Sequence, residues 1–223
     1  MTEIMGRMNT EPLSPDELLS TTRSVRKRLD LQRPVPIELV RECLQVAVQA
    51  PTGSNRQDWH WIVVTDAAAR AQIAAYYRRS FERYYRSSPA PENLYPDDPA
   101  RAGVQRRVAA SAVYLAERMG EVPVLVIAGI TVDSGRLPEG NQAGLWGSLL
   151  PAVWSYMLAA RARGLGTSWT SLHLAYEREV AELLGIPAGV RQGALIPTAY
   201  YTGDSFRPAP RAPLDEVIHL DRW

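Results

Sequence analysis

The chain of 223 residues has little of several features that would each define a class of protein. Its single cysteine, Cys43, excludes an internal disulfide and any site built on paired cysteines, and fits a reducing compartment. The three histidines, His60, His173 and His219, show no paired spacing, which argues against a metal site. The formal net charge of +1 argues against a general nucleic-acid binder, which needs a strong basic excess.

Long apolar runs are also missing. The longest, residues 122–130, has the length of a buried strand and not of a membrane span. Residues 1–12 lack the hydrophobic segment of a signal peptide, and the chain has no GxGxxG motif, Walker loop or internal repeat, so a Rossmann dinucleotide site is not supported. We therefore expect a cytoplasmic protein without a membrane partner, with a flexible leader at 1–12 and a single domain at 13–223.

Hydrophobic patterning predicts helices and strands that alternate irregularly. Ser14 and Glu17 form a capping box, Cys43 lies on the apolar face of a core helix, and Asp66 caps the helix that follows. Helices are expected at residues 14–21, 36–50, 67–88, 99–119, 144–166 and 174–185. Alternating or β-branched runs predict strands at 59–64, 122–130, 193–203 and 216–223. Long helices between widely spaced strands suit a three-layer α+β domain.

A basic cluster follows the first expected helix. Arg23, Arg26, Lys27 and Arg28 surround Ser24, and a small hydroxyl beside guanidinium groups suits a phosphate dianion. A solvated basic turn would give the same pattern. The aromatic and arginine-rich helix at 67–88 has two interpretations as well, a nucleic-acid surface or, more in keeping with its amphipathic pattern, the border of a ligand cleft.

The loop between the second expected helix and the first strand is rich in polar side chains. Pro51 and Gly53 end the helix and permit unusual backbone angles, while Asn55 and Gln57 offer donors and acceptors to a polyol or a heterocycle. The same side chains can also satisfy the loop's own backbone. The segment 167–173, around Trp169, either presents backbone N–H groups to a flat ligand or forms a polar turn over a buried tryptophan.

Proline and glycine mark several helix ends and loops after residue 86. Pro151 predicts a first turn or a kink, and Gly164 and Gly166 end the helix. Residues 87–103, rich in proline and acid, read as a mobile excursion able to cover a site. Basic anchors near both ends with a polar loop between them suggest a flat, phosphorylated cofactor.

Four segments together resemble the nitroreductase family of FMN-dependent oxidoreductases. They are RSVR at 23–26, APTGSNRQDWHWIVV at 50–64, ARARGLGTSW at 160–169 and RAPLDEVI at 211–218, in the family's order and at its spacing from about residue 20 onward. The resemblance implies a three-layer α/β/α fold with a mainly antiparallel sheet, in a homodimer that exchanges its C-terminal segments. Three departures stand out: Thr22 replaces a frequent arginine, Arg28 an aromatic residue and Asp58 a proline. They leave open which cation meets the phosphate and which lies near the ring.

The resemblance also implies which residues bind FMN. The RSVR segment grips the cofactor, the loop before the first strand reaches it, often from the partner subunit, and the late arginine closes on its phosphate. The implied residues are Arg23, Ser24, Arg26, Pro51, Thr52, Asn55, Gln57, Ser148, Pro151, Ser168, Trp169, Thr170 and Arg211.

The activity that the resemblance implies is a ping-pong hydride transfer. NADH or NADPH reduces the flavin, and a small-molecule acceptor such as a nitroaromatic or quinone then takes its place; no protein nucleophile is required. Two alternatives stay open. One is another flavin chemistry on the same fold, either reductive dehalogenation or oxygen-dependent breakdown of the flavin, and the other is a non-catalytic flavin-binding or flavin-delivery protein.

Overall fold

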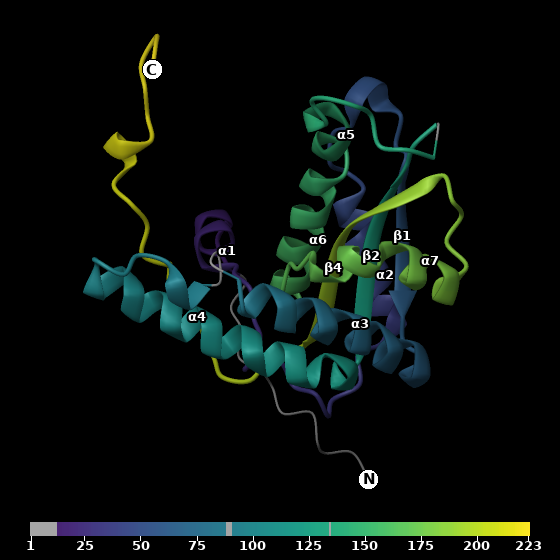
Figure 1. Ribbon diagram of the computed structural model, residues 1–223, viewed down its shortest axis with the longest axis horizontal. Coiled ribbons are helices and arrows are strands. Elements are labelled where there is room, and N and C mark those ends of the chain that lie inside the picture. The colour runs from purple at the N-terminus through teal and green to yellow at the C-terminus, as the bar shows by residue number, and fades with distance from the viewer. Residues whose placement is uncertain (1–12, 88–90, 134) are drawn as a thin grey trace.

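The computed structural model describes residues 13–87, 91–133 and 135–223. The expected leader at residues 1–12 lies outside this part of the chain, as do three residues of the expected excursion, 88–90. One four-stranded antiparallel sheet runs through the middle of the molecule in the order β1-β2-β4-β3 (Figure 1). Its strands are β1 (Trp59–Val64), β2 (Val124–Thr131), β3 (Leu165–Thr167) and β4 (Val190–Tyr200).

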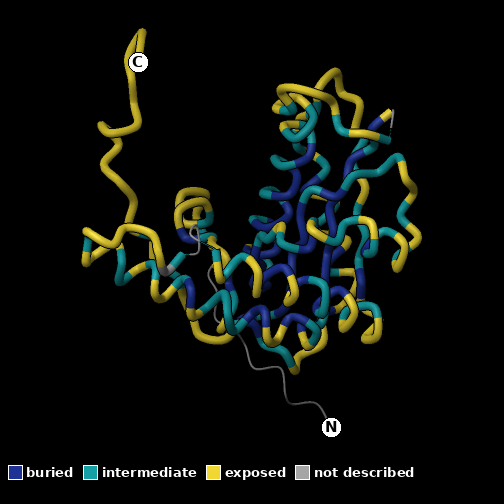
Figure 2. The backbone as a smooth tube through the Cα atoms, in the orientation of Figure 1, coloured by how far each residue is buried: buried dark blue, intermediate teal, exposed yellow. Residues whose placement is uncertain are grey.

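Helices cover both faces of the sheet, which confirms the three-layer α+β prediction. One core cluster joins the sheet to α3, α4 and α7, and the other joins it to α2 and α6. The bounds of the helices are α1 (Pro15–Thr21), α2 (Ile37–Ala47), α3 (Ala67–Tyr85), α4 (Pro99–Arg118), α5 (Ala143–Gly147), α6 (Leu150–Ala162) and α7 (Glu177–Leu184). Figure 2 shows the buried backbone concentrated in the sheet and the inner sides of these helices.

Strand β2 explains the long apolar run of the sequence. Leu125 and Ile127 point into the cluster under α3 and α4, while Val126 and Ala128 point into the cluster under α2 and α6. A strand covered on both faces gains from apolar residues at every position, because alternate side chains enter opposite cores.

Several local predictions are confirmed. Ser14 Oγ accepts from the backbone of Glu17 at 3.3 Å, and the Glu17 carboxylate accepts from the Ser14 backbone at 2.9 Å, which completes the capping box. Asp66 caps α3 by accepting from Ala69 N at 2.8 Å. Cys43 is fully buried in the core, and burial raises the pKa of its thiol to about 11. The thiol is therefore protonated and inert at neutral pH.

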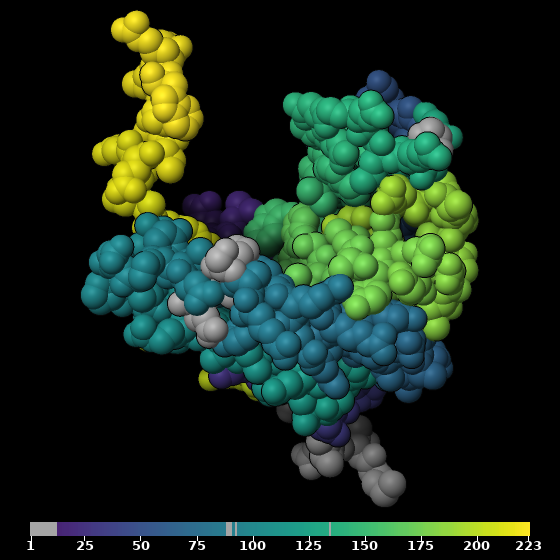
Figure 3. Space-filling view, in the orientation of Figure 1, coloured from purple at the N-terminus to yellow at the C-terminus, as the bar shows by residue number. Residues whose placement is uncertain are grey.

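The predicted strand at 216–223 is wrong. A 3-10 turn covers Leu214–Glu216, and the residues after it have irregular, exposed backbone. A strand needs a neighbour to accept and donate its backbone hydrogen bonds. The tail, residues 204–223, first packs Phe206 against the core, and Figures 1 and 3 show its final part leaving the body of the molecule and standing apart from it.

The predicted helix at 144–166 is two helices, α5 and α6, followed by β3. Pro151 lies in the first turn of α6, which confirms the first-turn prediction over the kink. Proline has no backbone N–H to donate to the preceding turn, so α5 cannot continue into α6. Strand β3, which has three residues, was not predicted from the sequence. Within the described ranges, no helix combines the length and apolar character needed to cross a bilayer.

Candidate functional site

The RSVR segment lies beside the short edge strand β3. Ser24 forms a parallel bridge with Thr167, and the backbone N–H of Val25 donates to the Thr167 carbonyl at 2.7 Å. This approach depends on Gly166, because a Cβ at that position would lie 3.1 Å from the Val25 Cβ and Cγ1 atoms. Strand β3 thus fixes the backbone that carries both arginines of the segment.

The guanidinium of Arg26 lies half-buried against α4. Its Nη1 atom donates to Ser111 Oγ at 3.4 Å, and no carboxylate among the described residues forms an ion pair with it. Burial lowers the pKa of Arg26, and the phenol of Tyr77 opposes that shift. Arginine stays protonated at neutral pH regardless. A half-buried cation that no carboxylate of the described residues neutralises favours an anion at this position.

The segment that follows β3 reaches the same place. Thr170 pairs with Leu195 of β4, and its Oγ1 atom donates to the hydroxyl of Tyr77 on α3 at 3.2 Å. Burial raises the pKa of Tyr77, while the Thr170 hydrogen bond and the charge of Arg26 lower it. The cluster that these contacts define is called the Arg26 corner. It consists of Ser24, Arg26, Tyr77, Ser111 and Thr170.

Ser168 and Trp169 lead from the core toward the Arg26 corner. The Ser168 side chain is fully buried, and its Oγ atom has no hydrogen-bond partner within the described chain. Its backbone N–H donates to the Pro197 carbonyl at 3.3 Å. Trp169 packs against the core under α2 and α6. Of the three residues predicted here, Thr170 is the one that the structure joins to another member of the corner.

The polar loop before β1 has a strained backbone. Ser54, Asn55 and Gln57 all have positive φ, between 52° and 56°, which is uncommon for residues other than glycine. Hydrogen bonds within the loop support it: the Gln57 backbone donates to Thr52 Oγ1 at 3.2 Å, and the Gln57 side chain donates to Asn55 Oδ1 at 3.1 Å. Each such residue costs about 1–3 kcal/mol, so the surrounding contacts hold the loop in one shape.

Ser148 connects this loop to α5. Its Oγ atom accepts from the Gly53 backbone at 3.0 Å and donates to the Gly144 carbonyl at 3.0 Å. Pro151, half-buried, follows one turn later in α6. The structure therefore brings the predicted Ser148 and the predicted loop together.

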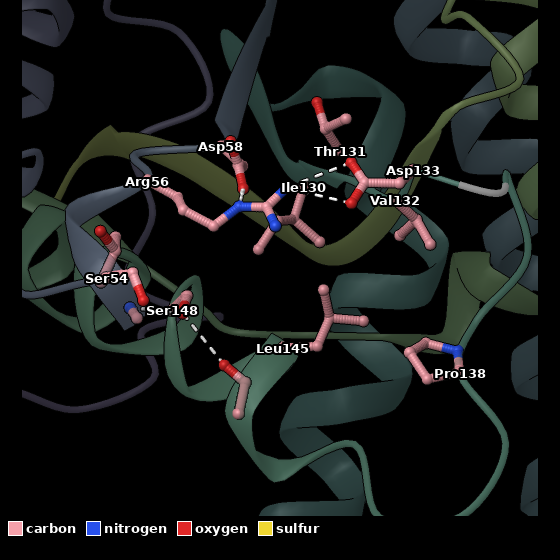
Figure 4. A pocket seen from close by; sticks show the side chains of 13 residues that line it. Ser54, Arg56, Asp58, Ile130, Thr131, Val132, Asp133, Pro138, Leu145 and Ser148 are labelled. Carbon is pink, nitrogen blue, oxygen red and sulfur yellow. Dashed lines mark hydrogen bonds and ion pairs between the residues drawn. The ribbon is translucent and has the colours of Figure 1, made fainter.

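A pocket of about 570 Å³ opens beside the loop (Figure 4). Arg56 crosses it, with ion pairs to Asp58 at 2.5 Å and to Asp133 at 3.1 Å. Asp58 is the residue that replaces the family's proline, and here it binds the guanidinium that ties the loop to the end of β2. These groups are largely exposed, so the pairs stabilise the loop by at most about 1 kcal/mol.

The loop and the Arg26 corner lie at opposite edges of the sheet. The loop leads into β1, one edge strand, where Trp59 pairs with Ile130, which in turn pairs with Arg191 of β4. The corner adjoins β3, the other edge strand, where Thr167 pairs with Thr198 of β4. Seven residues of β4, or roughly 23 Å, separate these pairs, and four residues, or roughly 13 Å, separate Arg191 from Leu195, the partner of Thr170 in the corner. One chain therefore does not bring the two predicted halves of the site together.

Arg211 and Arg23, which the resemblance implies at the same cofactor, lie apart in the described chain. Arg211 is exposed on the tail and lines a cavity of about 630 Å³ over the first half of α4. Arg23 instead donates to the Arg207 carbonyl at 2.7 Å. No hydrogen bond or ion pair within the described residues joins the two side chains.

Sequence reasoning missed four residues that the structure places in these two regions. Tyr77 and Ser111 belong to the Arg26 corner, and Arg56 and Asp133 line the loop pocket. Only the change from proline to Asp58 next to Arg56 could have signalled an ion pair. The part of the chain that the structure describes holds no group of three His, Cys, Asp or Glu side chains able to bind a metal.

Comparisons with known proteins find relatives that match most of the chain. The chain is 26% identical over 201 residues to an iodotyrosine deiodinase of Thermotoga neapolitana, which covers 90% of the chain and 94% of that protein. It is 29% identical over 188 residues to a 4-nitrobenzoate reductase of Nocardioides, covering 77% of the chain and 74% of the relative. A solved FMN and NADPH-dependent nitroreductase from sphigopyxis sp. strain HMH shares the fold with a TM-score of 0.70 at 23% identity, over 95% of the chain and all of that structure.

The α+β fold is therefore that of a nitroreductase-like protein. The model of the nitroreductase family matches residues 19–200, and the chain belongs to that family. The match includes the Arg26 corner and the loop, and it ends before the tail that carries Arg211.

Proposed function

We propose that the protein is an FMN-dependent NAD(P)H oxidoreductase that reduces nitroaromatic, quinone or related conjugated acceptors. The observation that carries the proposal is Arg26, half-buried beside Ser24 and without a carboxylate partner among the described residues. A chain of this family with an uncompensated cation next to an exposed hydroxyl suits a phosphorylated cofactor.

The donor set of the Arg26 corner fits the FMN phosphate. Arg23 uses one N–H on the Arg207 carbonyl and has four more for an anion. Arg26 and the Ser24 hydroxyl add further donors, and Arg211 on the tail is proposed as another contact. When bound, FMN supplies the hydride chemistry, while the chain holds, orients and tunes it. The charge of Arg26 stabilises negative charge that develops at the site.

The other contacts are proposed to come from a second copy of the chain. Pro51, Thr52, Asn55 and Gln57 are exposed or half-exposed on the far edge of the sheet, where they can reach the corner of a partner. A homodimer also accounts for the tail, whose apolar side chains contact little of their own chain. They are Leu214, Val217, Ile218, Leu220 and Trp223, between 49% and 100% exposed. Contiguous exposed apolar groups of this kind mark an interface.

The test is the visible absorption spectrum of the purified protein, before and after anaerobic addition of NADH or NADPH. Flavin bands that bleach with a nicotinamide and return with a quinone or nitroaromatic are the expected result, and they identify the donor as well. Bands that never bleach would instead indicate a flavin carrier. A protein that binds no added FMN would overturn the proposal.

Reductive dehalogenation is the second candidate, favoured by the likeness to an iodotyrosine deiodinase over 90% of the chain. It uses the same cofactor with a halogenated phenol as acceptor. Anaerobic protein reduced with dithionite and mixed with 3-iodotyrosine would then release iodide, whereas a nitroaromatic reductase would leave the iodotyrosine intact and consume a nitroaromatic.

A further inference from the structure

Tyr77 has a buried hydroxyl with an unused proton. Its side chain is 3% exposed, and its ring stacks on Phe81 with 6.5 Å between ring centroids. The hydroxyl oxygen accepts from Thr170 Oγ1 at 3.2 Å. A phenol that accepts a hydrogen bond keeps its own O–H free to donate, and no described residue accepts that proton. A buried donor left without an acceptor is costly, so the position favours a ligand atom or a water that a ligand orders.

Arg26, which comes from the RSVR segment, also has N–H groups left to donate to a ligand. Its charge lowers the pKa of the Tyr77 phenol, against the larger effect of burial, and its own direct contact is the hydroxyl of Ser111. Two groups with N–H or O–H donors left over, a guanidinium and a phenol, thus lie within electrostatic reach of each other at one end of the sheet. Their shared preference is for an electron-rich group, which matches a cofactor anion or a reduced ring.

Tyr77 also links two segments that are far apart in the sequence. Thr170 lies 93 residues from Tyr77, and their hydrogen bond ties the segment after β3 to the rigid helix α3. Arg26 arrives from the RSVR segment, which β3 holds from its other side. The phenol therefore stands where the two cofactor-binding segments of one chain meet the core.

We infer that Tyr77 is a positioning residue of the flavin site, one that fixes the Thr170 hydroxyl and completes, with Arg26, an electron-withdrawing corner for the cofactor. The inference rests on the proposed function, and it adds a residue and a role that the family motifs do not carry. Loss of the phenol oxygen is expected to loosen Thr170, weaken FMN binding and lower the reduction potential of the bound flavin.

The test compares Tyr77→Phe with Tyr76→Phe in the full-length protein. Tyr76 is the adjacent residue on α3, its ring stacks on Tyr176 at 5.3 Å, and the substitution keeps that stacking. FMN dissociation constants come from flavin fluorescence, and midpoint potentials from anaerobic titration with reference dyes. Since one hydrogen bond contributes about 1 kcal/mol, we expect Tyr77→Phe to weaken FMN binding about fivefold and make the potential more negative. Tyr76→Phe is expected to match wild type in both.

Variants of Thr170 distinguish a positioning role of Tyr77 from a general loss of packing. Thr170→Val removes the hydroxyl at nearly constant volume, and Thr170→Ser keeps it. If the two residues act through one bond, the effects of Tyr77→Phe and Thr170→Val do not add in the double variant, and Thr170→Ser restores wild-type affinity.

Two results would overturn the inference alone: a wild type that binds FMN with a Tyr77→Phe variant of equal affinity and potential, or effects that simply add in the double variant. A wild type that binds no FMN would overturn the proposed function, and this inference with it.

Discussion

The guanidinium of Arg28 lies over the ring of Phe206, with 4.1 Å from its Cζ atom to the ring centroid. Arg161 contacts the same ring at 4.8 Å, so two cations enclose it. Arg28 also donates to the carbonyls of Thr202 at 2.5 Å and Ser205 at 2.8 Å. The residue that departs from the family's aromatic pattern thus sets the direction in which the tail leaves the body.

Replacing Arg28 by leucine is expected to release the root of the tail. The change removes two charge-assisted hydrogen bonds and the contact with Phe206, and it should raise the dissociation constant of the dimer at least about tenfold. Sedimentation equilibrium measures the constant. Arg28→Lys, which keeps the charge but loses the fork of donors, should give an intermediate value. A leucine variant with wild-type dimer affinity would show that the root of the tail does not need this anchor.

Removing the tail after Asp215 is expected to abolish both the dimer and flavin binding. The deletion takes away four large apolar side chains, Val217, Ile218, Leu220 and Trp223, which are between 49% and 100% exposed in the single chain. Light scattering after size-exclusion chromatography reports the mass, and absorbance near the flavin bands reports the cofactor. A yellow, FMN-loaded monomer would contradict this expectation.

A larger side chain at Gly166 is expected to displace the RSVR segment. A Cβ there already lies 3.1 Å from Val25 and 3.2 Å from Leu29, so the branched side chain of Gly166→Val cannot fit without moving that backbone. FMN affinity should fall by more than about tenfold. The matched control is Gly103→Val on α4, where a Cβ meets only the ends of arginine side chains at 3.8 and 3.9 Å. Equal FMN affinities for the two variants, by fluorescence titration, would refute the role given to Gly166.

His173 is expected to make the stability of the fold depend on pH. It is fully buried, neither ring nitrogen has a hydrogen-bond partner among the described residues, and burial lowers its pKa to about 4, against a smaller opposing effect of Glu177. Because the unfolded chain binds a proton near pH 6.5 and the folded chain does not, the free energy of unfolding decreases as pH falls through this window. The loss between pH 7 and pH 5 should be about 2 kcal/mol.

Urea denaturation at pH 7 and pH 5 measures this effect, with His173→Leu as the comparison. Glu177 is paired with Arg191 and has a lowered pKa. The stability that this pair contributes is therefore lost mainly below pH 4.5, outside the interval compared. The leucine variant should lose much less stability than wild type over the same interval. Equal losses would assign the dependence to other groups.

Local signals in the sequence predicted most of the fold. Residues 59–64 alternate and form β1 with those bounds, and the Ser14 and Asp66 caps are where the sequence indicated. The strand predicted at the C-terminus is absent from the described chain, because β-propensity alone cannot supply the neighbour that a strand needs. Strand β3 was not predicted because three residues are too few to show the alternating pattern of a strand.

The candidate site was predictable only where its residues form motifs. Ser24 and Arg26 lie two residues apart in the sequence, and the loop before β1 has a distinctive composition. Tyr77 recurs at helical spacing with Ile73 and Phe81, so it has the pattern of an ordinary core residue. Its role depends on a contact with Thr170 across 93 residues, which no local pattern encodes.

In the proposed homodimer, each flavin site takes the Arg26 corner from one chain and the loop before β1 from its partner. Two variants test it, Arg26→Ala and the double substitution Asn55→Ala with Gln57→Ala, each expected to bind FMN poorly as a homodimer. Co-expressed with different tags, they form mixed dimers in which one site carries both defects and the other neither. FMN content should then recover to about a quarter of the wild-type value with random pairing. If the mixed sample binds no more FMN than the separate variants, each site is built within one chain and the account is wrong.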